Sequence, residues 1–247
     1  MLPILFLLAQ SPLPSRGLAV DILRPHFNNA ETSLLSVAAF ASGRVAVGPV
    51  VLRFELPYFR IDPSPGGPTA TLGNPYVGVE LGRGTHTRVS ATAGVRFAVV
   101  KDVDDAKTIG SYVDVSRFEA FRSNTFSIHT AVRLRMQNDA GFFVALSGGP
   151  TAWIPTQPHA KTEVVLHHEV SVGHQGSAAW FAVGYNGLSI LTEKPAAVGE
   201  LTIGELDLSI ARARGRVRPS FHLLLPIDEE YSAVVGFVIG LGVAIQL

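Results

Sequence analysis

The feature of this sequence that most constrains its fold is a repeated alternation of apolar and polar residues. Eleven such stretches occur between Thr32 and Leu247. Successive side chains of a β-strand point to opposite faces, so a strand that separates lipid from a polar interior must alternate in this way. Residues 124–137 illustrate the pattern with one apolar face, formed by Phe126, Ile128, Val132, Leu134 and Met136. The sequence therefore predicts an all-β, antiparallel transmembrane β-barrel.

The composition agrees with strands in lipid. Hydrophobic residues make up 47% of the 247 residues and charged residues 16%, yet no interior segment has the length and apolarity of a transmembrane helix. A soluble β-barrel or sandwich that binds a ligand is the alternative, and it would turn its apolar face inward. The 20 basic and 20 acidic residues cancel, so we expect no nucleic-acid partner. The chain has no cysteine, which excludes disulfides and thiolate metal sites.

The N-terminal residues 1–17 have the character of a secretory signal peptide followed by a short tail. An apolar run from Leu2 to Ala9 precedes a polar stretch that contains prolines. No linker or change in composition divides the remainder. We therefore expect a single barrel domain at residues 18–247 in the outer membrane of a Gram-negative bacterium.

Turn lengths predict the topology. Short segments rich in Gly, Asn or Asp alternate with long ones, as in bacterial barrels with short periplasmic turns and longer extracellular loops. The expected short turns are 42–44, 82–85, 138–140, 174–176 and 212–215. The expected long loops are 61–70, 101–123, 155–161, 191–196 and 226–230. The last strand then ends in the periplasm.

The strand count follows from closure. Bacterial single-chain barrels have an even number of strands, so one strand must be added to the eleven. The segment Leu18 to Phe27 is available, which predicts twelve strands, with ten as the alternative.

Two glycine-containing strands need a specific interpretation. Residues 231–247 contain Gly236 and Gly240 in the spacing of a helix-pairing motif. All glycines of this segment, however, fall on one face when every second residue is counted, as in a β-strand. The segment is therefore predicted to be a strand with Tyr231 and Ile239 on its lipid face. In residues 201–211 the alternation changes phase near Gly204, which predicts a β-bulge there.

Three segments resemble small, mostly uncharacterised outer-membrane β-barrel proteins of Gram-negative bacteria. They are LGNPYVGVELG at 72–82, GVRFAVVKDVDDA at 94–106, and the C-terminal residues 215–247. The chain is more distantly similar to porin-like proteins grouped with aromatic-degradation transporters. This resemblance implies a passive small-solute channel or a structural barrel. The expected partners are outer-membrane lipids and lipopolysaccharide, the barrel assembly machinery and a small solute.

Charged and histidine side chains on the inward face are the candidate pore-lining residues. The set is Arg53, Glu55, Arg88, Arg96, His129, Arg133, Arg135, His167, Glu169, Glu205, Asp207, Arg218 and His222, with Glu80 on the same face. Charges of both signs can pair across a narrow interior or line a water-filled path, and the sequence leaves both open.

A second cluster raises the question of enzymatic chemistry. Glu163, His167, His168, Glu169 and His174 lie close in sequence. His167 and Glu169 share a strand face, and Ser127 or Ser171 could complete a set for a lipid-modifying hydrolase, the alternative function. The helical H-E-x-x-H and the G-x-S-x-G motifs are absent. We therefore predict no enzyme, no metal site and no cofactor.

Two further expectations concern the ends of the strands. The loop 101–123 is expected outside the cell, with helical structure near residues 115–121. Aromatic girdles at the membrane interfaces are expected from Tyr58, Phe59, Trp153, Trp180, Tyr185 and Tyr231.

Overall fold

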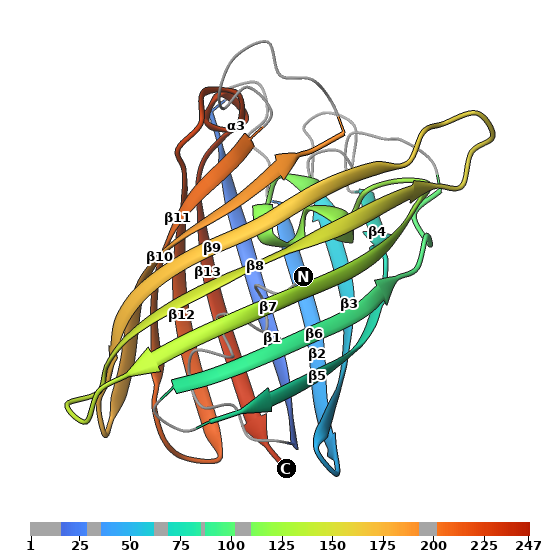
Figure 1. Cartoon of the computed structure of the whole chain (residues 1–247). Coiled ribbons are helices and arrows are strands. Elements are labelled where there is room, and N and C mark those ends of the chain that lie inside the picture. Colours follow the sequence, from blue (N-terminus) through green and yellow to red (C-terminus); the bar gives the residue numbers. More distant parts are fainter. Residues whose placement is uncertain (1–15, 29–35, 62–68, 85–86, 102–109, 193–201) are drawn as a thin grey trace.

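The computed structural model shows a closed antiparallel barrel of twelve strands with one additional short strand outside the ring (Figure 1). It describes residues 16–28, 36–61, 69–84, 87–101, 110–192 and 202–247. The predicted fold class and the predicted twelve strands are confirmed.

The strands of the ring follow the chain in order. They are β1 (Arg16–Phe27), β2 (Val37–Val47), β3 (Val50–Ile61), β5 (Tyr76–Arg83), β6 (Thr87–Arg96), β7 (Thr125–Gln137), β8 (Phe142–Pro155), β9 (Glu163–Gln175), β10 (Ala179–Ile190), β11 (Thr202–Arg212), β12 (Val217–Pro226) and β13 (Val235–Gln246). The additional strand is β4 (Thr69–Leu72). Two short helices complete the described elements, the 3₁₀ helix η1 (Val115–Ala120) and the α-helix α3 (Glu229–Val234).

The first and last strands close the ring. β1 pairs with β13 from Gly17 opposite Gln246 to Phe27 opposite Val235, and it pairs with β2 on its other edge. The segment predicted as the twelfth strand is therefore essential for closure, because without it β2 and β13 would have free edges. The C-terminus lies at the end of the barrel that carries the short turns (Figure 1).

The two faces of the wall differ as the alternation predicts. On β13, Ile239 and Leu241 are exposed on the outer surface, at 41% and 62%, whereas Gly240 and Gly242 face inward. Apolar side chains cover the outside and buried polar side chains line the inside. This arrangement suits a barrel surrounded by lipid and is the reverse of what a soluble barrel requires.

The predicted turn at residues 42–44 is wrong. β2 runs through these residues in unbroken register with β3, and the chain turns at Gly48 and Pro49, where Gly48 has φ +59°. Gly43 is needed for packing, because a Cβ at this position would collide with the ring of Phe54 on β3. A glycine that makes room for an aromatic ring on the next strand looks like a turn residue in a single sequence.

The predicted β-bulge at Gly204 is also wrong. The pairing of β10 with β11 keeps one register through Gly187 opposite Gly204 and Asn186 opposite Glu205. Gly204 instead lies against the ring of Tyr185, where a Cβ would approach ring atom Cε2 to 2.8 Å. The register shift observed on β1 lies between His26 and Phe27.

The last segment is a strand only from Val235 onward. Residues 229–234 form α3, whose N-terminus is capped by Asp228 through a hydrogen bond from the Tyr231 N–H. Tyr231 is fully buried, so its predicted lipid-facing position is wrong. Among the described residues, no helix is both long and apolar enough to cross a membrane.

The expected aromatic girdles are mostly wrong. Phe59, Trp153 and Trp180 are buried like Tyr231, and only Tyr58 and Tyr185 retain partial exposure. Phe59, Trp153 and Trp180 pack inside the wall because their strand positions face inward, and Tyr231 is buried from α3. They fill the barrel interior rather than mark its membrane boundaries.

An interruption separates β4 from β5. Both strands pair with β3, β4 at Tyr58 to Ile61 and β5 at Val50 to Glu55, and the register changes between them. The residues between them, Gly73 to Pro75, leave the sheet. This break places Asn74 where it contacts the interior segment described next.

Candidate functional site in the barrel interior

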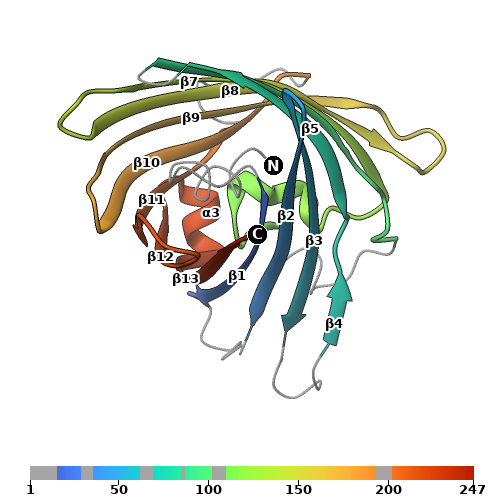
Figure 2. The ribbon, with the colours of Figure 1, turned by 90° about the horizontal axis from the view of Figure 1, so that it is seen from below.

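The segment between β6 and β7 folds into the barrel. Figure 2 shows η1 inside the ring of strands. The Tyr112 ring, which precedes η1, lies 5.9 Å from the Tyr231 ring of α3. Residues 113–117 and 119–121 are buried. The predicted helical structure near residues 115–121 is confirmed, but the described part of this loop lies within the barrel and is not exposed on its outer rim. We call residues 110–124 the inward segment.

An ion pair between Arg117 and Asp21 joins the inward segment to β1. Asp114 caps η1 by accepting a hydrogen bond from the Ser116 N–H at 3.0 Å. Arg117 donates from Nη2 to Asp21 at 3.1 Å and lies 3.1 Å from Asp114 through Nε. Its guanidinium also lies 4.0 Å above the ring of Phe40. Because these groups are buried, the pairs fix the position of η1 across the interior.

Asn74 connects the inward segment to the break between β4 and β5. Its Nδ2 donates hydrogen bonds to the carbonyls of Glu119 at 3.1 Å and Arg122 at 2.6 Å. Its Oδ1 accepts hydrogen bonds from the N–H groups of Val99 and Val100, both at 2.9 Å. The side chain is fully buried. One amide therefore satisfies backbone groups of the inward segment and of the residues that follow β6.

A polar cluster lies at the C-terminal end of η1. Glu119 Oε1 accepts hydrogen bonds from Trp153 Nε1 at 3.0 Å and His167 Nε2 at 2.6 Å. His129 lies beside this pair, with its Nδ1 3.0 Å from Thr151 Oγ1. Side-chain atoms of Glu119, His129 and His167 that could bind a metal ion all lie within 4.8 Å of one another.

The helices carry two groups with displaced pKa values. Burial acts to raise the pKa of the Glu119 carboxyl, but nearby groups, with His167 foremost and His129 next to it, together hold that pKa well below its ordinary range. Burial raises the pKa of the Tyr231 phenol well above its ordinary value, and the carboxylates of Glu205 and Asp114 add to this effect. Tyr231 donates a hydrogen bond to Glu205 at 3.4 Å.

Arginines converge on one carboxylate of β5. Glu80 accepts hydrogen bonds from Arg44 at 2.7 Å, Arg53 at 3.2 Å and Arg88 at 3.2 Å. The side chains of Arg44, Arg53 and Glu80 are less than 10% exposed, whereas that of Arg88 is 46% exposed. Nearby, Arg96 donates to Glu55 at 2.8 Å.

The candidate pore-lining residues lie mostly on the buried inner face. The buried members are Arg53, Glu55, Arg96, His129, Arg133, His167, Glu169, Glu205, Asp207 and His222. Arg88, Arg135 and Arg218 are more exposed and lie toward the short-turn end. Their role in lining a solute path stays a prediction.

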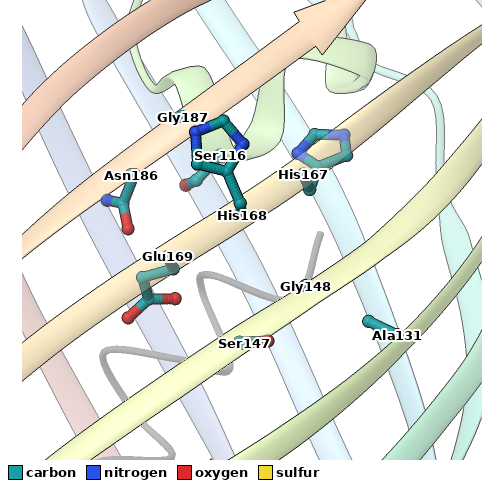
Figure 3. Close-up of a pocket in the computed structure, with 9 residues that line it drawn as sticks. All are labelled: Ser116, Ala131, Ser147, Gly148, His167, His168, Glu169, Asn186 and Gly187. Atoms are coloured by element: carbon teal, nitrogen blue, oxygen red, sulfur yellow. The ribbon is translucent and has the colours of Figure 1, made fainter. Parts of the chain in front are cut away.

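The five residues of the predicted His and Glu cluster do not come together. His167 and Glu169 face the interior, whereas His168 lies on the other face of β9, 5.7 Å from the Tyr185 ring (Figure 3). Glu163 pairs with Arg122, and His174 bonds the carbonyl of Ala140. The hydrogen-bond partner of His167 is the Glu119 carboxylate, where the hydrolase alternative requires a serine.

A small cavity remains beside the inward segment. It measures about 20 Å³ and is lined by Ser116, His167, Glu169 and Asn186, among others (Figure 3). That volume holds about one water molecule.

At the short-turn end, Phe143 and Trp180 stack with ring centroids 6.0 Å apart, and the Arg135 guanidinium lies 4.1 Å above Phe143.

Several interior residues escape prediction from the sequence. Asp21, Asn74, Asp114, Arg117 and Glu119 all contribute to the interior contacts. Strand alternation places Asp21 opposite the exposed Val20 and Ile22, which is a usable signal for an inward position. The other four lie in irregular or 3₁₀ segments, where no period assigns a face.

The comparisons with known proteins find similarity only at the level of structure. No protein-family model matches the sequence, and no curated protein matches it. The chain is similar to a solved structure of the COG4313 outer membrane channel from Pseudomonas putida F1, at a TM-score of 0.66 and 11% identity over 94% of this chain and 95% of that chain. It is similar to LpxR from Salmonella typhimurium at a TM-score of 0.50 and 11% identity, over 94% of this chain and 100% of that chain. A likeness to the CymD monoaromatic hydrocarbon channel is weaker, with a TM-score of 0.44, 10% identity, and coverage of 96% and 90%. At the level of the fold, the predicted resemblance to porin-like outer-membrane barrels is confirmed.

Proposed function

We propose that this chain is an outer-membrane channel of a Gram-negative bacterium, through which small polar solutes diffuse passively past the inward segment. The observation that carries the proposal is the combination of a closed, lipid-compatible barrel with a charged interior that a loop partly fills. The fold is shared with a solved outer membrane channel, which supports the same class of function.

The interior charges are unevenly distributed around the ring. The neighbouring strands β2, β3, β5, β6 and β7 carry six arginines and two carboxylates on the inner face: Arg44, Arg53, Arg88, Arg96, Arg133, Arg135, Glu55 and Glu80. β9 and β11 carry the carboxylates of Glu169, Glu205 and Asp207, whereas Asp21 on β1 is paired with Arg117 of the inward segment. An interior lined with charged groups orients polar and charged solutes and disfavours apolar ones. This lining favours a polar solute.

A swelling assay tests the proposal. Liposomes that contain the folded protein should swell when small sugars or amino acids enter, and the rate should fall as solute size increases. The matched control is liposomes that contain the heat-unfolded protein at the same ratio. Swelling no faster than this control for every solute would reject the channel in favour of a structural barrel.

A further inference from the structure

We propose that Glu119, His129 and His167 bind a divalent transition metal ion of the Zn²⁺ class, which ties the inward segment to the barrel wall. The three residues come from three separate parts of the chain, η1, β7 and β9. Their ligand atoms lie within 4.8 Å of one another. All three are buried, with 0%, 2% and 8% of their surfaces exposed.

Two polar atoms in this cluster point to a ligand. Within the described part of the chain, Glu119 Oε2 and His129 Nε2 have no hydrogen-bond partner. A buried donor or acceptor without a partner is costly, so native structures rarely leave two such atoms in one small cluster of side chains. A metal ion between the side chains would accept the lone pairs of both.

The surrounding contacts orient the ligands as they do in known metal sites. Thr151 Oγ1 contacts His129 Nδ1 at 3.0 Å, and when Nδ1 donates its hydrogen there, Nε2 carries the lone pair that a metal requires. Trp153 Nε1 donates to Glu119 Oε1 at 3.0 Å and holds the carboxylate in place. These two contacts are the outer partners that metal-binding His and Glu residues usually have.

The donor set selects the kind of ion. Two imidazoles and one carboxylate suit Zn²⁺ and its neighbours, and this set leaves a fourth position for water. Ca²⁺ and Mg²⁺ prefer sites made of oxygen ligands. Zinc ligands at about 2.0 to 2.2 Å from the ion lie roughly 3.3 Å from each other, so binding needs shifts of about 1 Å. The ion replaces the hydrogen that joins His167 Nε2 to Glu119 Oε1 at 2.6 Å.

The ion would act on the inward segment. Because Glu119 belongs to that segment and both histidines belong to the wall, a bound ion closes a bridge across the interior. This consequence rests on the proposed channel function: Zn²⁺ should lower conductance by holding the segment in place. Binding of the ion itself does not depend on that function.

Calorimetry on the full chain folded in detergent tests the site directly, with Zn²⁺ alone as the probe. One Zn²⁺ should bind per chain, and Ca²⁺ or Mg²⁺ at the same concentration should not bind. The variants His129→Gln, His167→Gln and Glu119→Gln should lose binding. His222→Gln is the matched control, because His222 is a buried interior histidine outside the cluster.

A variant that keeps all three ligands protects the test against misfolding. Thr151→Val removes only the outer contact of His129 and should weaken Zn²⁺ binding about 10- to 100-fold. No Zn²⁺ binding to the folded wild-type chain, or equal binding to the wild type and the His129 or Thr151 variant, would overturn the site. In planar bilayers, Zn²⁺ binding without any conductance would keep the site and reject the channel. Conductance without Zn²⁺ binding would support the channel and reject the metal site.

Discussion

Removing the Glu80 carboxylate should be among the most destabilising single changes in the barrel interior. Glu80 accepts hydrogen bonds from Arg44 and Arg53, whose side chains are 9% and 4% exposed. Glu80→Gln keeps the size of the side chain but leaves two buried guanidinium groups without their counter-charge. Breaking a buried ion pair by removing one partner costs about 3 to 5 kcal/mol, and we expect a loss of that size here.

Arg88 supplies the matched control on the same carboxylate. Its contact with Glu80 is 3.2 Å long, but its side chain is 46% exposed, so water and salt screen the pair. Arg88→Gln should cost less than about 1 kcal/mol. Both variants break ion pairs of the Glu80 carboxylate. They differ in burial, because Glu80→Gln breaks buried pairs and Arg88→Gln breaks an exposed one.

Urea unfolding in detergent or lipid vesicles measures both variants. Trp153 and Trp180, the two tryptophans of the chain, are both buried, so their fluorescence reports loss of the folded barrel. The reasoning would be refuted if Glu80→Gln cost less than about 1 kcal/mol, or if both variants cost the same. A cost below about 1 kcal/mol for Glu80→Gln would mean that water reaches the Glu80 cluster and screens all three arginines.

The remaining predictions concern the inward segment, the lipid face and selectivity. Asn74→Ala removes four hydrogen bonds, two of them to carbonyls of the inward segment, and should make this segment more accessible to protease in the folded barrel. Unchanged accessibility would contradict the role of Asn74 as an anchor. Leu241 lies at a 62% exposed position midway along β13, and Leu241→Arg should lower the free energy of unfolding by about 2 to 4 kcal/mol. The inward-facing control Ala244→Ser should cost much less. Equal costs in a urea titration would count against the assigned faces. If the barrel conducts, replacing Arg133 and Arg135 with Gln should shift the reversal potential in a salt gradient toward cations, and an unmoved potential would show that solutes do not pass this wall.

The strands were predictable because one physical constraint acts along their whole length. Where lipid lies on one side and a polar interior on the other, outward residues are apolar, and most outward positions of β7 and β13 follow this rule. The same constraint assigned inward positions to His129, His167 and Glu205, which are buried. A one-residue slip would place these charged groups in lipid, so the register follows from the pattern.

The wrong predictions concern residues where this constraint does not act, or where the same sequence pattern has two structural explanations. The sequence around Gly43 and Gly204 predicts a turn and a bulge, but both glycines make room for aromatic rings on neighbouring strands, Phe54 and Tyr185. Such partners are unknown until the strands are paired. Tyr231 follows the period of the strand after it, yet the Asp228 cap starts a helix there.

The course of the inward segment could not be predicted from the sequence at all. Glu119 meets His167 across 48 residues and Arg117 meets Asp21 across 96 residues. No local pattern relates residues so far apart in an irregular segment. Only the closed ring of strands brings these partners together, and the interior site therefore emerges at the level of tertiary structure.

Single-channel recording in planar bilayers tests the central claim most directly. The folded wild-type chain should give discrete conductance steps, and a variant in which a short Gly-Ser linker replaces residues 102–122 should give larger steps, because the inward segment no longer occupies the lumen. A heat-dependent shift on a denaturing gel would establish that both proteins are folded. Absence of conductance in both folded proteins would contradict the channel, and equal steps in both would contradict the inward segment as its constriction.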